Sequence, residues 1–321
     1  MKQVLPSLGA FALFAFASIL LTQDSAAQQP AKPPTQSQPE ATLKVDVKLV
    51  NVYVTVTDAH GSPVAGLNKD NFIVEEDGRE QKIAVFDKES SQPISIGLAV
   101  DTSLSTRHDL PLEQAAAKRF AHSLIRPVDA LAVYGFNETV YESTHGYTSE
   151  LKRIDEAIDH IHLGAATALY DAIYLVSRSL DKRQGRKVIV LITDGGDTVS
   201  KIDYKEAVRA AEEAEAIVYS IIIVPIEASA GRETGGEHAL IQLSEDTGGK
   251  YYYATSNGQL DQAFRKISDE LRTQYLLAYY PSQRLSFSEF RRIDVRFSGV
   301  PDAAQYRARH RAGYYSVKSD F

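Results

Sequence analysis

The sequence predicts an α/β protein with a doubly wound, mostly parallel sheet, inserted into or flanked by a small β-sandwich-like module. Two patterns lead to this expectation. Between Pro93 and Thr273, short apolar runs alternate with helical stripes, which is typical of a parallel sheet covered by helices on both faces. Before and after that region, apolar and polar residues alternate, as in strands that bury one face.

Residues 1–27 have the features of a cleaved secretory signal peptide. Lys2 is followed by an apolar run from Leu8 to Leu21 and then by the small residues Ser25-Ala26-Ala27. The alternative is a membrane anchor, but a bilayer span needs about 20 apolar residues and this run is shorter. We therefore expect an exported protein, periplasmic or extracellular, without a membrane span once the signal is removed.

The composition excludes several classes of protein. The 321 residues, 44% of them hydrophobic, are enough to bury a proper core. The absence of cysteine excludes disulfides, thiolate metal sites and a cysteine nucleophile. A net charge of −7, with lysines and arginines scattered through the chain, argues against nucleic-acid binding. No Gly-x-Ser-x-Gly elbow occurs, and no spacing pairs Ser, His and Asp for catalysis, so we do not expect an enzyme.

The regions that flank the α/β part are expected to form one β module. Residues 28–41 are rich in Gln, Pro, Ser and Thr and predict a flexible linker. Residues 42–90 show strand-like alternation but contain too few strands to close a sandwich alone. Residues 275–316 return to the same pattern, so we expect them to complete the module around an α/β domain at residues 91–274, with residues 317–321 as a tail.

Within the α/β domain, each element is predicted from its pattern of apolar residues. Nearly continuous apolar runs predict buried parallel strands; they are Ile94–Val100, Ala130–Phe136, Val188–Ile192, Ile217–Val224 and Lys250–Ala254. Apolar residues at helical spacing predict helices; these span Leu112–Leu124, Leu151–Ile161, Ala168–Leu180, Tyr204–Ala216, Ala239–Glu245 and Leu260–Leu271. The glycine-containing segment Gly231–Glu237 is interpreted as a mobile surface loop.

Oxygen-bearing side chains follow the central predicted strands. Asp101, Ser103 and Ser105 come after the first strand, Asp194 comes after the strand that ends at Thr193, and Thr167 stands where a helix opens. In an open α/β sheet, ligands bind at the carboxyl ends of the strands, near the point where the strand order reverses. We therefore expect these side chains on the same rim of the sheet.

This set of side chains suits a hard divalent cation such as Mg²⁺, with Mn²⁺ or Ca²⁺ as alternatives. Such an ion takes about six oxygen ligands, and Mg²⁺ usually keeps several waters. Hydroxyls are neutral donors, whereas the two carboxylates supply charge directly or through water. Because two carboxylates do not saturate the ion, it stays electrophilic and can take a carboxylate from a partner. The alternative interpretation is that the same residues are helix caps and turn residues, positions that these residue types favour.

The pattern resembles the metal-ion-dependent adhesion site of von Willebrand factor type A domains. Its pieces occur in the family's order as Asp101-x-Ser103-x-Ser105, Thr167 and Asp194-Gly195. The resemblance covers about residues 93–273 and implies a Rossmann-like fold. It also implies that the hydroxyls reach the metal directly, that the carboxylates bind mainly through water, and that an Asp or Glu of a partner completes the shell.

Outside that region, segments such as Asp58–Val64 and Leu271–Pro281 resemble a bacterial secreted subfamily of these proteins. The function that the sequence predicts is divalent-metal-dependent protein binding, as in adhesion, outside the cytoplasm. One alternative is a structural or assembly scaffold in which the metal only stabilises loops. A more remote alternative is a metal-assisted hydrolase, which would need a general base beside the metal.

Overall fold

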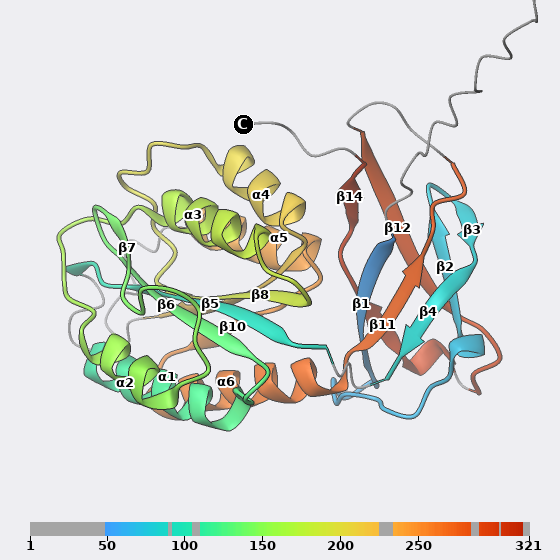
Figure 1. Cartoon of the computed structure of the whole chain (residues 1–321), viewed down its shortest axis with the longest axis horizontal. Coiled ribbons are helices and arrows are strands. Elements are labelled where there is room, and N and C mark those ends of the chain that lie inside the picture. Colours follow the sequence, from blue (N-terminus) through green and yellow to red (C-terminus); the bar gives the residue numbers. More distant parts are fainter. Residues whose placement is uncertain are drawn as a thin grey trace, which may run out of the picture. The chain divides into compact units, whose positions relative to one another are not determined.

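The computed structural model describes residues 49–88, 92–104, 110–224, 234–283, 289–301 and 303–316 (Figure 1). These residues belong to one compact unit, Asp46–Phe321. The predicted signal peptide, linker and C-terminal tail lie outside the described residues. In the ranges that are described, no helix has the length and apolar character needed to cross a membrane.

A six-stranded sheet forms the centre of the α/β region, in the order β10-β9-β8-β5-β6-β7. Its strands are β5 (Ile94–Asp101), β6 (Ala130–Phe136), β7 (Val140–Glu142), β8 (Arg186–Thr193), β9 (Ala216–Ile223) and β10 (Tyr251–Ala254). Only β7 runs antiparallel to its neighbour. Every residue of β5, β6 and β9 is buried, in agreement with the nearly continuous apolar character of these strands. The predicted doubly wound, mostly parallel sheet is confirmed.

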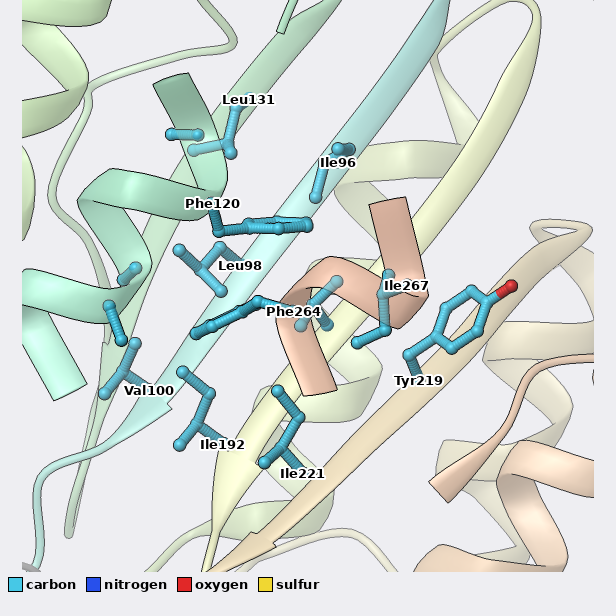
Figure 2. Close-up of a cluster of buried hydrophobic side chains, with 14 of the residues drawn as sticks. Ile96, Leu98, Val100, Phe120, Leu131, Ile192, Tyr219, Ile221, Phe264 and Ile267 are labelled. Atoms are coloured by element: carbon cyan, nitrogen blue, oxygen red, sulfur yellow. The ribbon is translucent and has the colours of Figure 1, made fainter. Parts of the chain in front are cut away.

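Helices cover both faces of this sheet (Figure 1). One face packs against α1 (Leu110–Leu124), α2 (Leu151–Asp159) and α6 (Asn257–Thr273). The other packs against α3 (Leu169–Asp181), α4 (Tyr204–Glu213) and α5 (Thr234–Asp246). Figure 2 shows the first of these cores, where Phe120 of α1 and Phe264 of α6 lie beside Leu98 of β5. The two phenylalanine rings stack with their centroids 4.6 Å apart.

Two four-stranded antiparallel sheets make up the rest of the described chain. One has the order β13-β1-β11-β4 and the other β14-β12-β2-β3. The strands are β1 (Val50–Thr57), β2 (Phe72–Glu76), β3 (Arg79–Gln81), β4 (Ile83–Asp87), β11 (Tyr275–Tyr279), β12 (Phe290–Phe297), β13 (Arg307–Arg309) and β14 (Gly313–Tyr315). Short 3-10 turns span Lys69–Asn71 and Ala303–Gln305.

Both of these sheets combine strands from the two ends of the chain. In the first, β1 pairs with β11 and β13; in the second, β2 pairs with β12. Their inner faces contribute to one shared hydrophobic core, which includes Val54, Phe72 and Tyr275. The chain therefore leaves these sheets after β4, builds the α/β region, and returns to them at β11.

Two predicted boundaries are wrong for identifiable reasons. The helix expected at Tyr204–Ala216 ends at Glu213, because Glu215 adopts a left-handed conformation with φ of 57° and Ala216 already belongs to β9. The loop expected at Gly231–Glu237 is helical from Thr234, while residues 231–233 lie outside the described residues. The short strands β3, β7 and β14 were not predicted, because three residues are too few to show a recognisable alternation of apolar and polar side chains.

The packing in Figure 2 leads to a prediction about stability. Phe264 is 3% exposed and stacks on Phe120, so Phe264→Ala should leave a cavity and lower the free energy of unfolding by roughly 3 to 5 kcal/mol. Phe290, which is 37% exposed, provides the matched control, and Phe290→Ala should cost about 1 kcal/mol or less. Urea denaturation followed by circular dichroism measures both; equal losses in the two variants would contradict the packing.

Candidate metal site

The two candidate carboxylates follow adjacent parallel strands. Asp101 is the last residue of β5, and Asp194 comes directly after β8. These strands pair with Val100 opposite Ile192, so their carboxyl ends coincide. Asp101 is fully buried, at 0% exposure, whereas Asp194 is half-buried. The parallel pairing of β5 with β8 therefore places both acids on the same edge of the sheet.

Both carboxylate oxygens of Asp101 are held by hydrogen bonds. The backbone N–H of Ser103 donates to Oδ1 at 2.9 Å, and the hydroxyl of Thr193 donates to Oδ2 at 2.6 Å. The same Thr193 hydroxyl accepts a hydrogen bond from the Gly195 N–H at 3.1 Å. Gly195 has φ of 95°, a conformation that favours glycine. The end of β5 and the turn after β8 are thus joined through a single threonine.

The electrostatics of Asp101 favour a cation nearby. Burial raises the pKa of its carboxyl from 3.8 to about 6, the hydrogen bonds from Thr193 and Ser103 oppose this rise, and the charge of Asp194 adds to it. A buried carboxylate beside a second acid is unfavourable unless positive charge compensates it.

The segment that carries Thr167 is anchored to the ends of two strands. The Gly164 N–H donates to the Thr102 carbonyl at 2.9 Å, just beyond β5. The Ala168 N–H donates to the Asn137 carbonyl at 2.6 Å, just beyond β6. Thr167 lies between these anchors and is 5% exposed. The backbone around this candidate ligand is therefore tied to the same edge of the sheet as Asp101.

The loop after β8 supports Thr167 from the other side. The Thr198 hydroxyl accepts the Thr167 N–H at 2.9 Å, and the Thr198 N–H donates back to the Thr167 carbonyl at 2.8 Å. Asp197 accepts hydrogen bonds from the N–H groups of Leu169 and Tyr170, at 2.9 and 3.3 Å, in the first turn of α3. A carboxylate at a helix N-terminus is favourable, because it meets unpaired N–H groups and the positive end of the helix dipole.

Helix α5 closes on the turn after β8. A Cβ atom at Gly236 would lie 1.5 Å from the Gly195 carbonyl oxygen, so only glycine fits there. The sequence predicts that this glycine lies in a mobile loop, whereas in the structure it packs closely against the turn that carries Asp194. A glycine inside a helix is the signal that could have revealed this approach.

The structure brings four of the five predicted ligands to one edge: Asp101, Ser103, Thr167 and Asp194. Ser105 lies outside the described residues. Within the ranges described, no three His, Asp or Glu side chains gather as a metal-binding group. The candidate donors are the carboxylates of Asp101 and Asp194 and the hydroxyls of Ser103 and Thr167. All are hard oxygen donors, and they fit a hard divalent cation better than a transition metal that prefers nitrogen or sulfur.

The sequence model of the von Willebrand factor type A domain matches residues 95–266, more than half of the 321 residues. The chain therefore belongs to the von Willebrand factor type A family. No curated protein matches the sequence.

Solved structures are similar to the chain at low sequence identity. A von Willebrand factor type A protein from Catenulispora acidiphila is 11% identical, with a TM-score of 0.50 over 84% of this chain and 75% of that one. This likeness concerns the fold alone. BatB from Bacteroides thetaiotaomicron is 20% identical, with a TM-score of 0.44 over 56% of this chain and 100% of its own. The von Willebrand factor domain of the type V pilus tip protein Mfa5 from Porphyromonas gingivalis is 11% identical, with a TM-score of 0.44 over 56% of this chain and 95% of that one.

The raised pKa of Asp101 leads to a prediction about stability without metal. Its folded pKa of about 6 lies above the unfolded value of 3.8, so its stabilising contribution is complete below pH 3.8 and is lost as the pH rises through 6. This difference corresponds to at most about 3 kcal/mol. Asp101→Asn should therefore raise the free energy of unfolding in EDTA at pH 7.5.

The same substitution should bring little gain at pH 4, where Asp101 is already protonated in the folded protein. Thermal unfolding of both proteins in EDTA at the two pH values measures the effect. A gain that is the same at pH 4 and pH 7.5 would show that the ionisation of Asp101 does not cause it.

Proposed function

We propose that this protein is an exported, divalent-cation-dependent binding protein. In this proposal Asp101, Ser103, Ser105, Thr167 and Asp194 hold the cation, Mg²⁺ or Mn²⁺, with Ca²⁺ as an alternative. When bound, the cation supplies an electrophilic position for an Asp or Glu carboxylate of a partner protein. The pattern of residues 1–27 supports export, and family membership supports a site of this kind.

The observation that carries the proposal is the buried, oriented carboxylate of Asp101. Burying a carboxylate beside Asp194 is unfavourable in the protein alone, yet both of its oxygens are fixed by hydrogen bonds rather than left to rotate. The hydroxyl-bearing residues Ser103 and Thr167 are also buried, at 3% and 5% exposure. Such an arrangement is preorganised for a small cation, because little ordering remains when the ion binds.

The residues around the site then have distinct tasks. Thr193 holds Asp101 in place and links it to the turn of Asp194 through the Gly195 N–H. Thr198 fixes the backbone of Thr167. With only two carboxylates in the donor set, the shell of a divalent ion is not filled with anions, so the ion stays electrophilic and can take a further carboxylate from outside.

Calorimetric titration of Mg²⁺ and then Mn²⁺ into the purified protein tests this proposal. We expect saturable binding at a single site. Ser103→Ala should weaken it at least about tenfold, because even losses in the outer shell of a metal site weaken binding by this factor. Ser177→Ala is the matched control, since Ser177 is equally buried but donates to the Ile173 carbonyl within α3, away from the site. This variant should bind the cation with the wild-type affinity.

Absence of binding to the wild-type protein would contradict the proposal, and so would equal affinities in the two serine variants. The scaffold alternative makes a different prediction for any partner that is found: binding would persist in EDTA and in Asp101→Ala. The proposal requires that both treatments abolish it.

A further inference from the structure

Large aliphatic side chains are exposed beside the candidate ligands. Leu104, directly after Ser103, is 57% exposed. Leu163, immediately before the anchored Gly164, is 38% exposed, and Val199 is 45% exposed. The Val199 N–H donates to the Thr167 carbonyl at 3.2 Å, which places this residue next to another candidate ligand. We call Leu104, Leu163 and Val199 the apolar collar.

The collar belongs to segments that are held by hydrogen bonds. Gly164 is bonded to Thr102, and the loop of Val199 is bonded to Thr167. The neighbouring backbone is thus fixed while these side chains remain exposed to water, which is unfavourable for apolar surface. Exposed apolar residues beside a candidate ligand site are characteristic of interaction sites, and functional loops are typically carried by a rigid scaffold.

The charges on this edge of the sheet restrict how many acidic residues a partner segment can carry. The described segments 101–104, 136–139, 162–169 and 193–201 contain four acidic residues, Asp101, Glu138, Asp194 and Asp197, and one lysine, the exposed Lys201. Glu138 takes part in the same edge, because its carboxylate accepts the Ala165 N–H at 2.8 Å. Acidic residues outnumber the single lysine in these segments, so a bound cation would attract one acidic residue of a partner while further acids would meet an excess of negative charge.

We infer that the collar selects partner segments in which a single Asp or Glu is flanked by apolar side chains. This inference rests on the proposed function, in which a bound cation holds a partner carboxylate (the metal clamp). It adds which partner sequences are preferred. The carboxylate would bind the cation, and its apolar neighbours would be buried against Leu104, Leu163 and Val199. The complementarity is that of one negative charge to the cation and of apolar flanks to the collar, on a surface that disfavours additional acids.

A peptide array tests the inference. Three sets of immobilised peptides carry one central Asp flanked on both sides by Leu, by Ser or by Glu, and are probed with labelled protein in Mn²⁺ or in EDTA. We expect the Leu-flanked set to retain about ten times more protein than the Ser-flanked set in Mn²⁺, from burial of one or two apolar side chains. The Glu-flanked set should retain the least.

Variants assign the preference to the collar. The double variant Leu163→Ser, Val199→Ser should reduce or abolish this roughly tenfold preference for Leu-flanked over Ser-flanked peptides. Val128→Ser is the matched control: Val128 is 60% exposed but precedes β6, at the opposite edge of the sheet, and should keep the full preference.

The outcomes separate this inference from the function on which it rests. If peptide retention requires Mn²⁺ but does not depend on the flanking residues, the inference about the collar is wrong while metal-dependent binding of the carboxylate still holds. A preference for Leu flanks that persists in EDTA would support the collar and contradict the clamp. If no peptide is retained in either condition, or if the double variant behaves like wild type, the collar is overturned.

Discussion

The parallel pairing of β5 with β8 is the constraint on which the site depends. These strands are far apart in the chain, yet Val100 lies opposite Ile192, so Asp101 and Asp194 emerge at the same edge. The order of the sheet reverses at this pair: later strands are added on the β8 side, and β6 and β7 lie on the β5 side. Connections therefore leave toward opposite faces, and the loops beyond the strand ends part to create a place for a ligand.

The candidate site combines an unfavourable charge with rigid support. Burial raises the pKa of Asp101 to about 6, so in the absence of a cation the ionised carboxylate reduces stability at neutral pH. Hydrogen bonds from Thr193 and Ser103 nevertheless hold this side chain in one orientation. Residues that favour binding over stability in this way are typical of functional sites, since natural proteins locate such conflicts where a ligand relieves them.

The antiparallel sheets are tied to the α/β region by buried polar contacts. Arg186, the first residue of β8, donates to the side-chain oxygen of Gln274 at 2.9 Å. The amide nitrogen of Gln274 donates in turn to the Thr55 hydroxyl of β1 at 3.1 Å. Gln274 lies between the end of α6 and the start of β11, so the point where the chain returns to the antiparallel sheets is fixed on both sides. Buried polar groups of this kind are unfavourable unless paired, which makes the geometry specific.

The sequence by itself determined the type and order of the long elements and the edge on which Asp101, Thr167 and Asp194 lie, because apolar periodicity and the strand-end rule are local signals. Tertiary structure decided what supports them. That Thr193 bridges Asp101 and Gly195, and that Gly236 packs on the site rather than loosening a loop, depends on contacts between residues distant in the chain. The pKa of Asp101 is likewise raised by burial and by the charge of Asp194, against the hydrogen bonds from Thr193 and Ser103. Only the packed sheet sets that burial and brings Thr193 and Asp194 close, whereas local sequence encodes neither depth nor proximity.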